Sequence, residues 1–168
     1  MKKIFLFSFF ILLGSLYSKP AQAQYAKYKA LYIYNFTKRI DWPEENKKGN
    51  FIIGVYGKSD ITQYLINISK KKKVLNQPIE VKTFHSTNDI EYCHIILIPK
   101  EQSKKINEIN KYIRNKATLS ISEKKDERTC INFIENNKTL SFQINSEMIR
   151  KKHMKLSQSL INLGIEIK

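Results

Sequence analysis

Short, continuous apolar runs that alternate with helical periodicity are the feature that most constrains the fold of this chain. Phe51–Tyr56 ends at Gly57, and Ile95–Ile98 ends at Pro99. Strands of a parallel sheet have this composition because both of their faces are covered. A helical pattern follows each run, so the sequence predicts βαβ units and an α/β fold.

The other elements predict three layers. Helices are expected over residues 24–41, about 60–71, 102–115, a short stretch after Asn145 and a last stretch ending at Gly164, and further strands over 79–84, 118–122, 131–134 and 140–144. The last two strands flank Asn136-Asn137, which tolerates the positive φ angles of a tight hairpin turn. We therefore predict a Rossmann-like three-layer sandwich, with a mostly parallel sheet and a late antiparallel hairpin.

The first 23 residues have the layout of a secretory signal peptide. Two lysines follow Met1, residues 4–17 are almost wholly apolar, and Ala21-Gln22-Ala23 is a small-x-small cleavage site. The apolar run of 14 residues is shorter than the roughly 20 that a membrane-spanning helix needs. An uncleaved anchor is the alternative. We expect cleavage after Ala23, a single domain over residues 24–168, and a periplasmic protein.

The charge of the chain is strongly positive. The sequence has 30 Lys and Arg against 15 Asp and Glu, a net charge of +15. Loss of Lys2, Lys3 and Lys19 with the leader leaves +12. This charge attracts anionic lipid, polysaccharide or nucleic acid, or it reflects only a lysine-rich composition. No aromatic residue lies beside the run Lys70–Lys73 to stack on bases, so we expect no nucleic-acid partner.

Motifs for catalysis or metal binding are missing from the sequence. Gly54 and Gly57, in the stretch that ends Gly-Lys-Ser, have two residues between them, whereas a Walker loop needs four. This loop is either a plain strand-to-helix turn or a small-anion site at a helix N-terminus. The three histidines have no metal-ligand spacing. Cys93 and His94 are adjacent on a strand, so they point to opposite faces and cannot form a nucleophile–base pair. We therefore expect no enzyme activity, no cofactor and no metal.

The two cysteines of the chain are Cys93 and Cys130. An oxidising compartment favours a disulfide between two such thiols. The bond requires Cα atoms within about 7 Å, which sequence does not reveal. The thiols either pair with each other or stay reduced and buried.

Several motifs, taken together and in order, resemble the YfiR family of secreted bacterial proteins. The first is Ala30–Lys38 followed by Asp41-Trp42-Pro43, and the later ones are 51–57, 93–98, 118–122, 142–145 and 156–163. The resemblance covers nearly the whole chain after the leader. It departs from the family pattern at the cysteines, because neither Cys93 nor Cys130 has a local partner.

The resemblance implies a non-catalytic periplasmic α/β sensor. Such a protein would bind and modulate a membrane-anchored signalling protein, a diguanylate cyclase or a histidine kinase, and homodimerisation is the default expectation. Tyr34, Asn35, Phe36 and Trp42 are either an aromatic helix with its stop, packed on the sheet, or the lining of a ligand pocket. The alternative function is a soluble periplasmic binding protein for a small anion or an anionic polymer.

Overall fold

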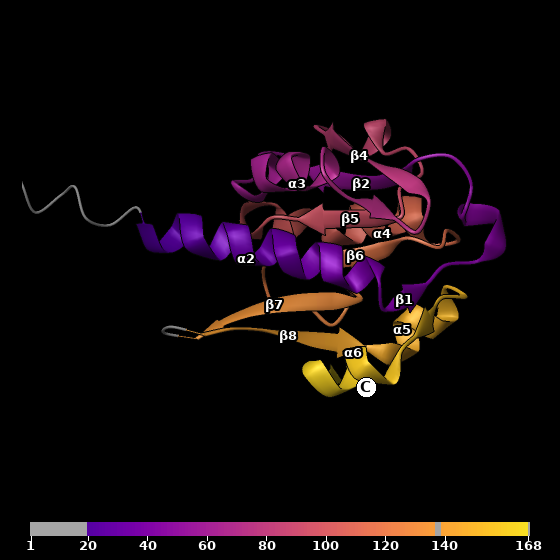
Figure 1. The fold of residues 1–168 in the computed structure, drawn as a ribbon. Helices are drawn as coiled ribbons and strands as arrows, with labels where there is room; N and C mark the ends of the chain where they lie inside the picture. The colour runs from indigo at the N-terminus through magenta and orange to yellow at the C-terminus, as the bar shows by residue number, and fades with distance from the viewer. Residues whose placement is uncertain (1–19, 137–138, 168) are drawn as a thin grey trace, which may run out of the picture.

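The computed structural model describes residues 20–136 and 139–167. Most of the expected leader and Asn137 of the expected turn lie outside these residues. Figure 1 shows a curled sheet with helices on its two faces, and the long helix α2 (Pro20–Thr37) runs along one of them.

Eight strands form the main sheet in the order β10-β8-β7-β6-β5-β2-β4-β3. Their bounds are β2 Phe51–Tyr56, β3 Lys73–Val74, β4 Gln77–Phe84, β5 Ile95–Ile98, β6 Leu119–Ser122, β7 Ile131–Asn136, β8 Thr139–Asn145 and β10 Ile165–Ile167. Strands β4, β2, β5, β6 and β7 are parallel, and β8 pairs with β7 in an antiparallel hairpin. The predicted α/β class, with a late hairpin on a mostly parallel sheet, is confirmed.

The helices connect the strands. After α2 the chain forms α3 Ile61–Ser69, α4 Ile106–Ile113, α5 Ser146–Lys151 and α6 Gln158–Leu163, with the 3-10 turns η1 Glu44–Asn46, η2 Thr87–Asp89 and η3 Lys100–Lys105. Asn145 caps α5 and Ser157 caps α6, each accepting a hydrogen bond from a backbone N–H of the first turn.

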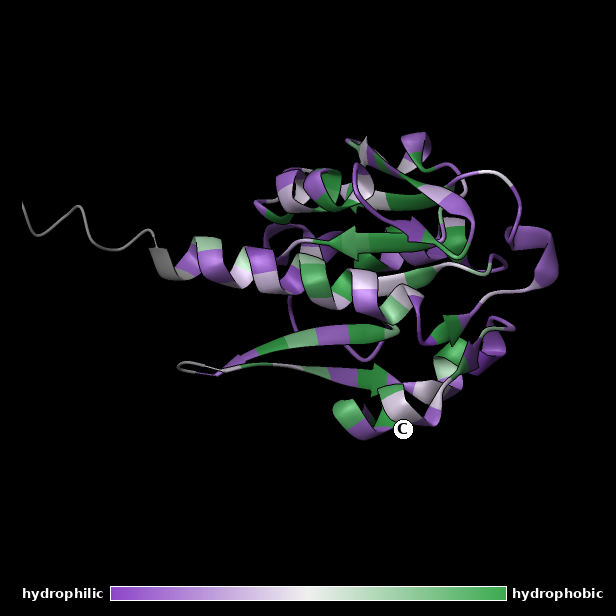
Figure 2. Ribbon diagram, viewed as in Figure 1, coloured by the Kyte–Doolittle hydropathy of each residue, from purple (hydrophilic) through white to green (hydrophobic). Residues whose placement is uncertain are grey.

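Two core clusters lie on opposite faces of the sheet. Alternate residues of β5 point to opposite faces, so Ile95 and Leu97 pack in the larger cluster and Ile96 and Ile98 in the smaller one. The larger cluster includes the buried sides of α2 and α3, and the smaller one includes those of α4. Figure 2 shows the hydrophobic strands between these helices. The three layers predicted from the sequence are therefore α2 with α3 on one face, the sheet in the middle, and α4 on the other face.

The sheet curls around α2. The ring of Phe36 on α2 lies 4.9 Å from that of Phe142 on β8 and 6.2 Å from that of Phe133 on β7. The ring of Tyr32 meets Phe142 edge-on at 5.4 Å and lies tilted to Phe133 at 6.3 Å. The hairpin therefore packs against one side of α2, while α3 contacts the other side.

Several local elements differ from the prediction, and one of them is the two-residue strand β3, which was not expected. The first helix ends at Thr37, because Ile40–Asp41 forms strand β1, which pairs with β9 (Lys155–Leu156). A strand, β10, follows Gly164, where we expected the chain to stop after a helix. The third helix begins as the 3-10 turn η3 before it becomes α4.

Candidate functional site

A large cleft lies where the chain reverses direction across the sheet. From β2 the chain passes through α3 to β4 on one side, and it later returns to β5 on the other side of β2. The carboxyl ends of these parallel strands border a common crevice, which is where open α/β sheets bind ligands. The structure has a cleft of about 920 Å³ at this place, bordered by the first half of α2 and the residues that follow β2, β4, β5 and β6.

The loop after β2 is held in a tight conformation beside α3. Gly57 has a φ of 79°, which favours glycine, and its N–H donates to the carbonyl of Phe84 at 2.8 Å. Ser59 accepts a hydrogen bond from the N–H of Ile61 through its hydroxyl at 3.2 Å. A Cβ on Gly57 would lie 3.2 Å from the side-chain nitrogen of Gln102, which closes the loop from the β5 side. The loop is thus a fixed wall of the cleft.

A buried ion pair forms the inner side of the cleft. Lys29 on α2 is only 6% exposed, and its Nζ lies 2.5 Å from Oε1 of Glu123, just after β6. Glu135 on β7 is a second partner of the same ammonium group. Burial alone lowers the pKa of Lys29, but hydrogen bonds and charge interactions with the two carboxylates outweigh it, and the net shift of the pKa is upward. Lys29 therefore stays charged and ties α2 to two strands.

The charges of the cleft are mixed. Its charged side chains are three lysines and four carboxylates, namely Lys29, Lys58, Lys100, Asp60, Glu101, Glu123 and Glu135. His85 adds an imidazole ring with two nitrogens that can take part in hydrogen bonds. Both signs of charge near one opening suit a polar ligand that carries both donors and acceptors. They do not form the concentrated positive field that a phosphate needs.

The described residues show no arrangement for bond-making chemistry at the cleft. Ser59 caps α3, and the hydrogen bonds of the described residues include none between Ser59 and His85. Within residues 20–136 and 139–167, no three His, Cys, Asp or Glu side chains gather as metal ligands would.

The aromatic motif residues lie away from this cleft. Phe36 is buried against the hairpin, and Asn35 is exposed on the outside of α2. Tyr34 is half-buried, with the Lys38 ammonium 4.5 Å from its ring centroid. The structure therefore places this part of the motif in the packing of α2, and the ligand-pocket interpretation has no support here.

Trp42 belongs to a second aromatic group beneath η1. Its Nε1–H donates to the carbonyl of Ala117 at 3.1 Å, and its ring meets Phe51 edge-on at 5.0 Å. The ring of His94 stacks on that of Phe51 at 4.3 Å, and the ring of Tyr92 lies edge-on to the His94 ring at 5.0 Å. These rings fill the space between the β1–β2 connection and the sheet.

His94 fastens the η1 connection to the sheet. Its Nδ1 accepts the N–H of Ile52 at 3.0 Å, so the proton of the neutral ring is on Nε2, which donates to the carbonyl of Asn46 at 2.7 Å. Burial lowers the pKa of this ring, although the hydrogen bond to Asn46 acts in the opposite direction. His94 is thus a buried, hydrogen-bonded neighbour of the core.

The two cysteines do not meet. Both thiols are free and fully buried. Cys93 belongs to the cluster under α4, and Cys130 belongs to the cluster under α2 and α3. The Cys93–Cys130 bridge that the sequence left open is therefore not formed in the structure. Burial raises the pKa of Cys93 to about 12 and also raises the pKa of Cys130.

The sequence did not point to the residues that shape the cleft. Lys29, Glu123 and Glu135 are far apart in the chain, and no local motif marks them. The one available signal was the Gly57–Ser59 loop, which the sequence placed between a strand and a helix. Ala23, the predicted cleavage residue, lies in the first turns of α2, close in sequence to Tyr25 and Ala26 at the cleft.

Comparisons with known proteins bear on the chain as a whole. No described helix has both the length and the apolar character needed to cross a bilayer. A comparison with curated proteins gives no match. Among protein families, the YfiR/HmsC-like family matches residues 26–165, a range that includes both core clusters and all of the cleft lining except Gln22 and Tyr25. The resemblance drawn from the sequence motifs is confirmed, and the chain belongs to the YfiR/HmsC-like family.

Proposed function

We propose that this protein is a periplasmic, non-catalytic regulator that binds a membrane-anchored signalling protein and modulates it. The signalling protein is a diguanylate cyclase or a histidine kinase. The observation that carries the proposal is the family match over residues 26–165, since the YfiR/HmsC-like family supports a regulatory role in cyclic-di-GMP signalling. The amino-terminal leader motif supports export, which would place the protein on the same side of the membrane as a receptor's periplasmic part.

The cleft gives this regulator a place for a signal. Lys29 holds α2 to the end of β6 and to β7, and it also borders the cleft. A ligand that offers Lys29 a new partner, or takes Glu123 or Glu135 from it, would change how tightly the first half of α2 is held. Helix α2 also packs along α3 and the β7–β8 hairpin. A shift of α2 would therefore change the packing over much of one face of the sheet.

The charges of the cleft argue against the alternative function. A binding protein for a small anion needs an excess of cations at its site, whereas the cleft has more carboxylates than lysines. The positive charge of the chain lies mostly elsewhere on its surface.

Two measurements test the proposed function. In cells, deletion of the gene should change the cyclic-di-GMP level or the phosphorylation state of a response regulator, and the full-length gene should restore it. The matched control is a gene that lacks residues 1–23, whose product keeps the family domain but loses the leader. Equal restoration by both genes would contradict a periplasmic site of action.

The partner is identified by affinity capture from solubilised membranes. The tagged, folded protein should enrich a membrane protein that carries a cyclase or kinase domain. The same protein, thermally unfolded before capture, serves as the control. Enrichment of no such protein by folded material, checked by circular dichroism, would count against the proposal.

A further inference from the structure

The end of the molecule opposite the cleft carries an exposed apolar side chain within a basic surface. Leu75 lies in the two-residue turn between β3 and β4, and 75% of its surface is exposed. This turn is at the amino end of β4, whereas the cleft is at the carboxyl ends of the parallel strands. The two features are therefore separate sites on one molecule.

The conformation of Leu75 is unfavourable for its residue type. Its φ is 52°, in the left-handed region, which glycine and asparagine adopt readily and branched side chains avoid. The next residue, Asn76, is of the type that suits this conformation. A leucine that is strained and also exposed contributes nothing evident to folding. Backbone strain of this kind occurs preferentially where a residue has a function.

Cations surround Leu75 on the neighbouring elements. Lys38, Arg39 and Lys155 border a hollow of about 430 Å³ together with Leu75. Lys38 also contacts the ring of Tyr34, and the Tyr34 hydroxyl donates to the carbonyl of Lys73 at 3.5 Å, so the end of α2 and β3 are in direct contact.

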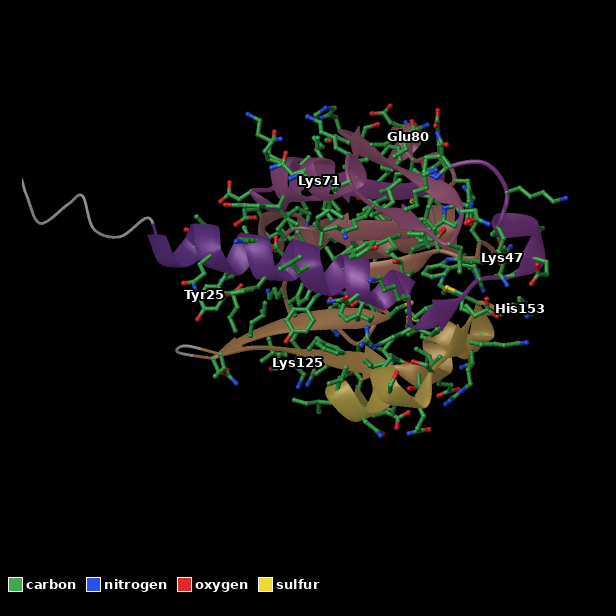
Figure 3. All side chains as sticks on the ribbon, viewed as in Figure 1. Tyr25, Lys47, Lys71, Glu80, Lys125 and His153 are labelled. Atoms are coloured by element: carbon green, nitrogen blue, oxygen red, sulfur yellow. The ribbon has the colours of Figure 1, made fainter. Side chains whose placement is uncertain are left out.

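The lysine run extends this basic surface along the chain. Lys70–Lys73 lead from the end of α3 into the Leu75 turn, and all four side chains are exposed. Figure 3 shows Lys71 on the outside of the molecule near α3. The one carboxylate that borders the hollow is Asp41, and Lys47 already pairs with it at 2.7 Å. Three cations thus border the hollow with an exposed leucine, four more lie on the segment that leads to it, and no free acidic side chain is among the residues that border the hollow.

We propose that this surface, made of Leu75 with Lys38, Arg39, Lys70–Lys73 and Lys155, docks on the anionic phospholipid headgroups of a membrane. The cations would lie against lipid phosphates, and Leu75 would enter the boundary between headgroups and acyl chains. Clustered cations with an inserted apolar side chain supply the two attractions that reversible membrane binding needs. The inference goes beyond the proposed function, because its partner is lipid and not a signalling protein.

Docking in this way would restrict the regulator to the surface in which its receptor is embedded. It would also orient the cleft away from the bilayer, since the two sites lie at opposite ends of the parallel strands. The lysine run, which has no role in the cleft, then has a function.

The test measures partition of the processed protein onto vesicles of phosphatidylcholine with and without phosphatidylglycerol, by co-sedimentation. Binding should require phosphatidylglycerol and weaken steeply with added salt. The variant K71Q/K72Q should bind about 25-fold more weakly, at about fivefold for each cation near an anionic surface. The matched control is K124Q/K125Q, which removes two exposed lysines that follow β6 at the carboxyl end of the sheet. At 0.1 M salt the vesicle binding of this control should stay within about twofold of wild type. The Debye length is then about 10 Å, so lysines at the far end of the molecule are screened from the lipid phosphates.

Leu75→Asn separates docking from folding. Asparagine adopts the left-handed conformation more easily, so the thermal midpoint should be equal to or above that of wild type. Vesicle binding should nevertheless fall by about tenfold or more, because the inserted apolar side chain is lost. Leu75→Gly should behave in the same way.

Three results would overturn the proposal. The first is vesicle binding that does not depend on phosphatidylglycerol. The second is an equal loss of vesicle binding in K71Q/K72Q and K124Q/K125Q. The third is vesicle binding by Leu75→Asn that equals that of wild type. Retention on polyglutamate resin together with no binding to vesicles would assign the surface to an acidic protein instead.

Discussion

Lys29 on α2 pairs with Glu123 after β6, with 2.5 Å between Nζ and Oε1, although 94 residues separate them in the chain. Both side chains are largely buried, and Glu135 from β7 joins the same ammonium group. One lysine thus holds the long helix to the edge of the cleft. Its position makes it both a stabilising contact and a part of the candidate site.

Lys29→Met should destabilise the protein by about 2–3 kcal/mol. The substitution leaves Glu123 buried without its cation, and removal of one partner from a buried pair costs about 3–5 kcal/mol. The half-exposed Glu135 lowers the expected value, since water can solvate that carboxylate. Urea unfolding measures the change. Lys27→Met, at an exposed position of the same helix, is the control and should change stability by less than about 0.5 kcal/mol. Equal effects of the two substitutions would contradict the role of the buried pair.

Acidification should destabilise the protein through His94. The pKa of His94 is lowered in the folded state, first because the ring is buried, so the unfolded chain binds a proton at a higher pH than the native protein does. Stability is therefore unaffected by this group above the unfolded pKa of about 6.5 and falls as the pH drops from there toward the folded value. A charged ring would also lose Nδ1 as the acceptor for Ile52.

The pH effect is isolated by comparison with His94→Asn. Denaturant unfolding between pH 8 and pH 5 should show a smaller loss of stability in this variant than in wild type. His85→Asn, at an exposed histidine outside this hydrogen-bond network, is the control variant. Parallel curves for wild type and His94→Asn would show that His94 does not cause the loss.

The sequence predicted the central part of the fold well because local patterns determine it. The apolar runs at Phe51–Tyr56 and Ile95–Ile98 are strands, and the apolar spacing of Ile106, Ile109 and Ile113 marks the buried side of α4. The sequence did not predict β1 or β10, because each is a strand of two or three residues that exists only through its partner, β9 or β8.

The cleft could be predicted only in part for the same reason. A strand-to-helix loop such as Gly57–Ser59 is visible in a local pattern, and parallel strands imply a crevice at their carboxyl ends. The contact of Lys29 with Glu123 and Glu135 depends on how the sheet curls around α2, which no local pattern specifies. Likewise, the separation of Cys93 from Cys130 follows from their places in different core clusters.

The thiols of Cys93 and Cys130 should both be free and unreactive in the native protein. Each is fully buried, and the pKa of Cys93 is raised to about 12, so almost no thiolate exists at pH 8. A thiol reagent added without reductant should label fewer than about 0.1 thiols per native chain, whereas two thiols should react after unfolding in guanidinium chloride. If neither thiol were labelled in the unfolded protein without reductant, the two cysteines would instead form a disulfide.

Trp42 should contribute to stability and not to ligand or partner binding. Trp42→Phe keeps an aromatic ring against Phe51 but removes the Nε1–H that donates to the carbonyl of Ala117. Loss of this part-buried hydrogen bond costs about 0.5–1.5 kcal/mol, so the urea midpoint should fall with an unchanged m-value. Capture of the membrane partner, measured well below the unfolding transition, should equal that of wild type, because Trp42 is buried beneath η1 and does not border the cleft. Tyr34→Phe is the matched control, since it removes only an exposed hydroxyl whose hydrogen bond to Lys73 is 3.5 Å long. A loss of partner capture by Trp42→Phe, with stability unchanged, would restore the interpretation of this motif as part of a binding site.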